Sequence, residues 1–367
     1  MRHGHRHPTR RDFVKRSAGA VLGTAAGGLI PAKAWGRPSS DKPAVSVVRI
    51  RDGRVDRAVE EAIDLLGGME TVAKGKDRIM LKPNLVAESP TFTTKPAVVK
   101  TLAQLMQRAG KEVSIGEGSA AASGFNVKGA VTYRTRNREM LDRMQQYVFD
   151  NLGYSELAKS LKVQLVNLHS GELGEVEVPN GFVFDKLTLH ESLIETDMLC
   201  SVPMMKTHVL ATVTLGMKNL IGVYPGTVYY SVRAWLHDQA AMAESPGIAF
   251  ETIDMVRANK LGLTVVDASS AMEGDGPSSG TLVPMNLIVA GTNPLATDLV
   301  AADVMGIGPS DVPTFTWAYK AGLGPATVED VEVRGAKLDD VRRPFARPNV
   351  VPWGAINKMW GVEEIPA

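Results

Sequence analysis

The sequence predicts an α/β protein with mostly parallel sheets flanked by helices, arranged as two α/β lobes around a cleft. Three observations support this class. Short apolar runs alternate with segments of helical periodicity along most of the chain. Polar loops that contain glycine or proline follow several of these runs, as they do beyond the carboxyl ends of parallel strands. The 367 residues are enough for one large or two moderate domains with a substantial core.

The first lobe is expected over residues 42–200, where strands and helices alternate. Its strands are expected at Val45–Ile50, Arg78–Leu81, Val113–Ile115, Val163–Leu168 and Asp197–Val202, with a hairpin over Val176–Leu189. Its first two helices end at glycines, and a third lies in a polar, aromatic insertion near residues 125–161. The three helices are expected at Val55–Leu66, Ala97–Ala109 and Glu139–Asp150.

The second lobe is expected over residues 201–330. Its helices should span Phe250–Ala258 and Pro294–Met305, the latter with Asn293 as its N-cap. Its strands are expected at Leu263–Val266, ending at Asp267, and at Leu287–Ala290. Residues 331–367 should form a C-terminal extension with one short strand and a proline-rich tail.

Residues 1–34 are typical of a twin-arginine signal peptide. Arg10-Arg11 is followed by a polar residue and Phe13, then by a glycine- and alanine-rich apolar run over Ser17–Ile30. Ala32-Lys33-Ala34 fits a cleavage site. The apolar run is too short for a membrane span. We therefore expect recognition by the twin-arginine export machinery, a periplasmic or other extracytoplasmic location, and no stable membrane span after cleavage.

Charge and cysteine content narrow the partners and cofactors. The whole chain has a net charge of +1, and loss of the leader, with seven basic and one acidic side chains, leaves −5. Because this balance implies no basic face, we expect no nucleic-acid partner. Cys200 is the only cysteine, so one chain can form neither a disulfide nor a cysteine-ligated iron–sulfur cluster.

The densest polar segment runs from Pro203 to Gly222 and contains Lys206, His208, Lys218 and Asn219 within an apolar stretch. Each buried polar group must be paired or solvated, so this density favours a site of chemistry or anion binding. His208 has the side chain best suited to proton transfer near neutral pH, and lysines suit carboxylate or phosphate groups. If His208–Lys218 were one helix, its polar side chains would lie near one face. The alternative is a structural histidine beside a lysine that reaches water.

Polar residues also follow other predicted strands. Lys82, Asn84 and Glu117 come directly after strands of the first lobe, and Asp267 and Glu273 after a strand of the second. The acidic loop that contains Glu273 could bind a hard cation or form an ordinary turn, and no metal ligand is assigned. We expect one composite cleft, with His208, Lys218 and Lys206 as catalytic residues. The residues expected to bind substrate or cofactor are Lys82, Asn84, Glu117, Asn219, Asp267 and Glu273.

Five motifs together resemble the bacterial domain-of-unknown-function family 362, from about Val45 to Gly306, within an α/β domain at residues 42–330. They are Lys82-Pro83-Asn84, Gly116-Glu117-Gly118, Pro203-Met204-Met205-Lys206-Thr207-His208, Lys218-Asn219-Leu220-Ile221-Gly222 and Met272-Glu273-Gly274-Asp275-Gly276-Pro277. Many members of that family carry ferredoxin-like cysteine clusters, which this chain lacks. An electron-transfer role that depends on such a cluster is therefore not expected for this chain.

A remoter similarity is to the nickel-dependent lactate racemases. In that family a histidine precedes by ten residues the lysine that holds a nickel-pincer nucleotide, and a Pro-Gly follows shortly after. His208, Lys218 and Pro225-Gly226 have the same spacing. The resemblance implies a proton- or hydride-handling role for His208 and cofactor attachment at Lys218. At the position of the family's downstream nickel-binding histidine stands Ala234, with His237 nearby.

These observations favour an exported enzyme, isomerase- or racemase-like or redox-related, that performs acid–base chemistry on a small anionic substrate in a cleft rich in lysine, histidine and asparagine. The alternative is a non-catalytic periplasmic protein that binds a ligand or cofactor in the same cleft. His208→Ala would then leave the ligand affinity nearly intact. A third possibility, a structural or interaction protein, predicts no deep cleft.

Overall fold

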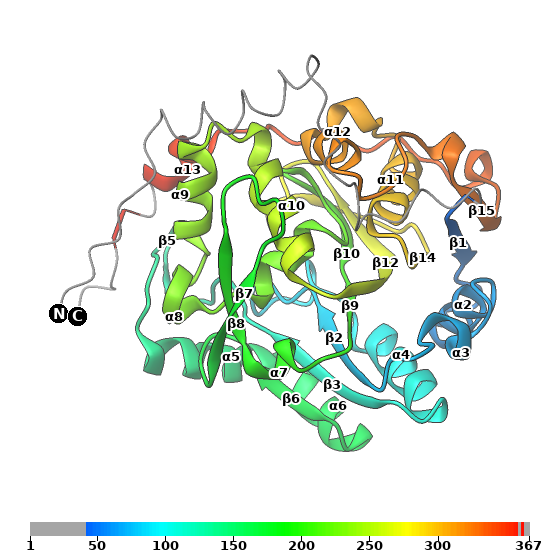
Figure 1. Ribbon diagram of the computed structural model, residues 1–367, viewed down its shortest axis with the longest axis horizontal. Helices are drawn as coiled ribbons and strands as arrows, with labels where there is room; N and C mark the ends of the chain where they lie inside the picture. Colours follow the sequence, from blue (N-terminus) through cyan, green and yellow to red (C-terminus); the bar gives the residue numbers. More distant parts are fainter. Residues whose placement is uncertain (1–41, 359–360, 363–367) are drawn as a thin grey trace, which may run out of the picture. The chain divides into compact units, whose positions relative to one another are not determined.

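Eleven strands form one mixed sheet in the computed structural model, which describes residues 42–358 and 361–362 (Figure 1). The predicted signal peptide, residues 1–34, lies outside the described residues. The main path of the sheet has the order β15-β1-β14-β12-β9-β2-β3-β6. Its strands are β1 (Ala44–Arg49), β2 (Arg78–Pro83), β3 (Glu112–Glu117), β6 (Gln164–Asn167), β9 (Met198–Val202), β12 (Leu261–Glu273), β14 (Leu287–Gly291) and β15 (Glu332–Gly335).

Most neighbouring strands of this sheet are parallel. The run from β12 through β9, β2 and β3 to β6 is entirely parallel, and β15 is parallel to β1. Only β14 on this path is antiparallel to its neighbours, β12 and β1. The predicted α/β class with mostly parallel strands is therefore confirmed. Strands from both predicted lobes share the sheet, and the division into lobes stays a prediction.

Helices cover both faces of the sheet (Figure 1). The helices are α2 (Val55–Asp64), α3 (Met69–Val72), α4 (Pro96–Arg108), α5 (Arg138–Asn151), α6 (Tyr154–Leu161), α7 (Glu191–Ile194), α8 (Gly226–Tyr229), α9 (Ala234–Met242), α10 (Ala249–Ala258), α11 (Pro294–Val304), α12 (Pro313–Lys320) and α13 (Trp353–Asn357). Because successive side chains of a strand point to opposite faces, Ile79 and Leu81 pack with α2, α4, α5 and α6, whereas Met80 packs on the side of α10, α11 and α12. The two cores hold the strand ends in fixed positions.

Short elements complete the chain. The predicted hairpin is formed by β7 (Leu173–Glu177) and β8 (Lys186–His190), and a small ribbon is formed by β4 (Val127–Lys128) and β5 (Val131–Thr132). A further strand, β13 (Thr281–Val283), pairs with β12. The 3₁₀ helices are η1 (Lys218–Val223), η2 (Pro246–Ile248), η3 (Pro309–Asp311), η4 (Val328–Asp330) and η5 (Leu338–Asp340). No helix among the described residues is long and apolar enough to cross a membrane.

Around the polar segment, the helical geometry considered for residues 208–218 is not found, and the expected end of one strand is wrong. Residues 208–218 do not form a helix: β10 (Met204–His208) and β11 (Thr212–Thr214) form an antiparallel hairpin, followed by η1. The β-branched residues of this stretch favour paired strands. The strand expected to end at Asp267 continues to Glu273, because β12 pairs first with β9 and then with β10 across the break at Pro203. Asp267 therefore lies inside a strand.

Candidate functional site

A cavity of about 530 Å³ lies at the carboxyl ends of β2 and β3. Its walls also include the end of β10, the start of η1, and parts of α9 and the C-terminal segment. Five of the predicted site residues line it: Lys82, Asn84, Glu117, His208 and Lys218. The rest of the wall is mostly apolar, with side chains such as Val86, Leu210, Ile221 and Ile356. The expected cleft between strand-end loops is thus present as a cavity with a few polar groups.

Lys82 and Glu117 form an ion pair in the wall of this cavity. Lys82 Nζ lies 3.0 Å from Glu117 Oε2, and both side chains are 2% exposed or less. Lys82 Nζ also donates to Asn219 Oδ1 at 2.7 Å, an oxygen that accepts from Asn84 Nδ2 at 3.1 Å. Burial lowers the pKa of Lys82, and the Glu117 carboxylate counteracts this shift. Four predicted site residues therefore belong to one hydrogen-bonded network.

Backbone geometry completes the support of Glu117. Its Oε2 accepts from the amide of Leu85 at 2.8 Å, and its Oε1 accepts from the amide of Gly118 at 2.9 Å. Gly222, in η1, lies directly against the pair: a Cβ added there would come within 2.6 Å of Lys82 Nζ and closer still to Glu117 Oε1. The glycine of the Lys218–Gly222 motif is therefore explained by the close approach of the pair.

Lys218 differs from the other buried cations because its ammonium group is unpaired. The side chain is 7% exposed and lines the cavity, yet Nζ has no hydrogen bond or ion pair with any residue that the structure describes. Burial lowers the pKa of Lys218 to about 8, against the raising influence of Glu251. An unpaired buried cation is costly, so the site favours an anion at this position.

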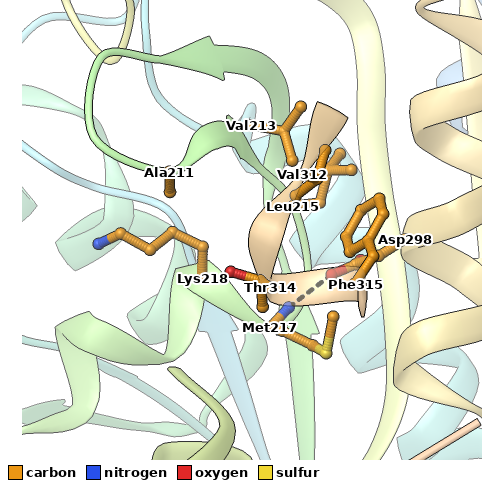
Figure 2. A pocket seen from close by; sticks show the side chains of 9 residues that line it. All are labelled: Ala211, Val213, Leu215, Met217, Lys218, Asp298, Val312, Thr314 and Phe315. Atoms are coloured by element: carbon orange, nitrogen blue, oxygen red, sulfur yellow. Dashed lines mark hydrogen bonds between the residues drawn. The ribbon is translucent and has the colours of Figure 1, made fainter. Parts of the chain in front are cut away.

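Asp298 of α11 holds the turn from which Lys218 projects. Its carboxylate accepts from the amides of Gly216 at 2.7 Å and Met217 at 2.9 Å, and Figure 2 shows the second bond with the Lys218 side chain directed away from it. Burial raises the pKa of Asp298 to about 7, although the two amides oppose the shift. The void beside it, also lined by Phe315, is only about 10 Å³. Asp298 is thus a positioning residue, not a second binding site.

His208 is held as a neutral imidazole. Its Nδ1 accepts from the amide of Leu210 at 3.0 Å, so the ring hydrogen is on Nε2. Burial lowers the pKa of His208 well below its usual value, and the charge of Lys218 adds to this effect. In this state Nε2–H is a hydrogen-bond donor. His208 can therefore polarise or protonate a ligand oxygen, but Nε2 has no lone pair with which to accept a proton.

Lys206 is separated from the cavity wall. The side chain is fully buried, and Nζ donates to the carbonyl oxygens of Phe92 at 2.7 Å and Pro277 at 3.1 Å. Burial lowers its pKa to about 7, with a smaller contribution from Lys82. The ammonium group therefore ties together two loops beside the site.

Asp267 and Glu273 also lie outside the cavity lining. Asp267 accepts from the amide of Lys95, the N-cap residue of α4, at 2.8 Å. Glu273 accepts from the amide of Ala346 at 3.0 Å, and its neighbour Asp275 accepts from that of Asn349 at 2.7 Å. The acidic loop thus anchors the C-terminal segment, and no group of three or more potential metal ligands was found in residues 42–358 and 361–362.

Arg233 is a further polar residue at the site, and sequence reasoning did not single it out. It is 2% exposed, and its guanidinium donates to carbonyl oxygens of Gly118, Gly222 and Tyr224 among others. It thereby joins the loop after β3 to η1. A single arginine outside any polar motif carried no signal of this role.

His237 of α9 and Glu251 of α10 form a further buried pair, of which the sequence pointed only to His237, near the position of the nickel-binding histidine. His237 Nδ1 lies 2.5 Å from Glu251 Oε1, both side chains are buried, and His237 lines the cavity. Their separation by fourteen positions conceals this pair in the sequence.

The fold and motifs agree with the comparisons to known proteins. A family described as "Domain of unknown function (DUF362)" matches residues 79–303, and the chain belongs to this family. A thylakoid-associated protein of Synechocystis sp. is 27% identical over 313 residues, which cover 82% of this chain and 88% of that protein.

Two solved structures are more distant. The lactate racemase apoprotein of Thermoanaerobacterium thermosaccharolyticum is 14% identical with a TM-score of 0.43, and the match covers 73% of this chain and 58% of that one. A Thermotoga maritima protein is 14% identical with a TM-score of 0.34, covering 59% and 50%. The matches thus span 58% and 50% of the lengths of the two solved chains.

The nickel-pincer nucleotide implied by the remoter resemblance fits these residues only at Lys218. Its amine faces the cavity without a partner in the described part of the chain. The position of the nickel-binding histidine is Ala234, whose methyl group cannot ligate a metal, and no group of three or more potential metal ligands was found among the described residues. The nickel half of the cofactor therefore does not fit, and no step is derived through it.

Proposed function

We propose that the protein binds a small organic anion in this cavity and performs acid–base chemistry on it. The observation that carries the proposal is the buried Lys218 ammonium group, which faces about 530 Å³ of space without a carboxylate within ion-pair distance among the described residues. A carboxylate or phosphate oxygen would supply the missing partner. The surrounding apolar wall suits the carbon skeleton of such a ligand.

The charges of the cavity wall support an anion over a cation. Lys82 is neutralised by Glu117, and Arg233 donates to backbone carbonyls. The other carboxylate of the wall, Asp275, is exposed and accepts from a backbone amide. Glu251 raises the pKa of Lys218 but does not form an ion pair with it, so Lys218 is the cation of the described wall that has neither a carboxylate nor a carbonyl contact. In a poorly solvated site such a charge attracts an anion more strongly than it would in water.

His208 supplies the second contact to the ligand. Its Nε2–H can donate to an oxygen that gains negative charge when a neighbouring proton is removed. Lys218 and His208 together would bind a carboxylate through one oxygen and polarise a second oxygen. Substrates of this chemistry are small acids with a carbonyl or hydroxyl group next to a removable proton.

Calorimetric titration tests the binding step. Acetate, short 2-hydroxy acids, dicarboxylates and inorganic phosphate would be titrated into the purified protein and into Lys218→Met. Loss of one charge-assisted hydrogen bond costs about 1.5–3 kcal/mol, so the variant should bind roughly 10- to 150-fold more weakly. Lys100→Met, on the exposed surface of α4, is the matched control. Equal affinity of Lys218→Met and the wild type would contradict the proposal.

Incorporation of solvent deuterium separates an enzyme from a binding protein. Acids that bind would be incubated with the protein in D₂O and followed by NMR. Exchange of a carbon-bound hydrogen indicates catalysis, whereas tight binding without exchange favours the non-catalytic alternative.

We also propose export by the twin-arginine pathway, on the strength of Arg10-Arg11 and the Ala32-Lys33-Ala34 site. Replacing both arginines by lysine should retain the protein in the cytoplasmic fraction. N-terminal sequencing of the exported protein should begin at Trp35. Export of the double-lysine variant at the wild-type rate would contradict this assignment.

A further inference from the structure

We propose that His237, oriented by Glu251, is the base that accepts the substrate proton in this cavity, while His208 is the hydrogen-bond donor. The inference rests on the proposed function, because it assigns the proton-transfer step of the same site. His237 is one turn into α9, and Glu251 is in the first turn of α10. Sequence motifs pointed to His208 for this role instead.

The hydrogen bonds of the two rings give them opposite capacities. Glu251 Oε1 lies 2.5 Å from His237 Nδ1, and we take the carboxylate as ionised, in which case it only accepts and holds the proton of His237 on Nδ1. The lone pair of His237 is then on Nε2, which has no partner among the residues described. His208 has the reverse arrangement, because its Nδ1 accepts from the Leu210 amide. The cavity therefore contains one imidazole that can accept a proton and one that donates.

The surroundings of Glu251 support a role beyond packing. The carboxylate is fully buried, and its Oε2 has no hydrogen-bond partner in the described part of the chain. Burying a charge with so few partners is costly, and the side chain that the Glu251 carboxylate contacts is His237. The charge of Glu251 also acts on Lys218 of the cavity wall, whose pKa it raises. When His237 gains a proton, Glu251 stabilises the resulting imidazolium, as carboxylates do for catalytic histidines.

The proton-transfer step then follows. A substrate C–H or O–H bond breaks, and its proton forms a bond to His237 Nε2. The electron pair stays on the substrate and is delocalised onto an oxygen that accepts from His208 Nε2–H and Lys218. Return of the proton from His237 to the same or another substrate atom restores the enzyme without any oxidant or reductant.

Histidine NMR tests the assignment without a substrate. Long-range ¹H–¹⁵N spectra of protein labelled with ¹⁵N-histidine distinguish the two tautomers, and His237→Gln and His208→Gln assign the signals. The expected result is a proton on Nδ1 of His237 and on Nε2 of His208. A proton on Nε2 of resting His237, or a metal bound there in the purified protein, overturns the proposal.

Deuterium exchange with an acid that binds tests the role in catalysis. His237→Gln should slow exchange by about 10²- to 10⁴-fold while the dissociation constant changes less than about threefold. Glu251→Gln should slow exchange and move the His237 proton to Nε2, and Glu251→Asp should restore part of both. If no acid binds at all, the proposed function fails. If wild-type protein binds an acid without exchange, or His237→Gln exchanges at the wild-type rate, the assignment of His237 fails although anion binding stands.

Discussion

Glu117→Gln should strongly destabilise the protein, because it removes one partner of a buried ion pair. Lys82 and Glu117 are 1% and 2% exposed, so solvent does not screen the charge left behind. Loss of one partner from a buried pair costs about 3–5 kcal/mol, which raises the unfolding equilibrium constant roughly 10²- to 10⁴-fold. Glutamine has nearly the same shape, so the loss reports the charge and one backbone hydrogen bond that its NH2 group cannot accept, and not volume. This is a large share of a typical total of about 5–15 kcal/mol.

Urea unfolding followed by circular dichroism measures this loss in the wild type, both single variants and Glu117→Gln/Lys82→Met. The double variant should be more stable than the sum of the single losses predicts, because it leaves no unpaired charge. The pH dependence gives an independent check. Without Glu117 the pKa of Lys82 in the folded state falls further below 10.5, where burial already places it. The unfolded state then binds more protons, so the stability deficit should shrink as the pH rises from 7 towards 10. A deficit below 1 kcal/mol, or strictly additive losses, would refute the reasoning.

Three other predictions concern neighbouring positions. Gly222→Ala should lower the free energy of unfolding by about 1–3 kcal/mol through overpacking, because its Cβ would come within 2.6 Å of Lys82 Nζ; the thermal midpoint should fall accordingly. Gly354→Ala, with open space around it, is the control and should be neutral or slightly stabilising. Anion affinity should decline as the pH rises above about 8, where unliganded Lys218 loses its proton, and Lys218→Met should show no such decline in titrations across pH. The raised pKa of Asp298 makes the folded state bind its proton more tightly than the unfolded state, so the wild type should lose stability as the pH rises from about 4 to 7, and Asp298→Asn should reduce this loss. An unchanged dependence of the unfolding free energy on pH, measured by urea unfolding, would contradict this.

The strand-end part of the site was predictable from sequence because its cause is local. Lys82 and Asn84 flank a proline that ends β2, and Glu117 is the last residue of β3. Parallel neighbouring strands place such positions at one edge of the sheet, and β2 and β3 pair directly. Hydrophobic periodicity therefore located these residues without any knowledge of tertiary contacts.

The polar segment after Pro203 was predictable in location but not in conformation. Lys206 and Thr214 are opposite each other in a hairpin that the sequence presents as a continuous polar and apolar mixture. Whether such a stretch forms a helix or paired strands depends on β12, which supplies the neighbouring strand of β10. Asp267 was misplaced for the same reason: β12 continues past it only because β10 is there to pair with. Long-range pairing of this kind leaves little trace in local propensity.

Some polar groups of the site already have hydrogen-bond or ion-pair partners in the protein, and others do not. Only the groups without such partners are free to act on a ligand. Lys82 has a carboxylate and an amide, and Lys206 has two carbonyls. Among the described residues, Lys218 Nζ and the Nε2 atoms of His208 and His237 have no such partner. Sequence density marked all three lysines as site residues, because partners supplied by backbone carbonyls and by distant helices are invisible to it. The three unpartnered groups are one cation, one hydrogen-bond donor and one proton acceptor around a single cavity. Proton transfer on a bound anion requires this combination.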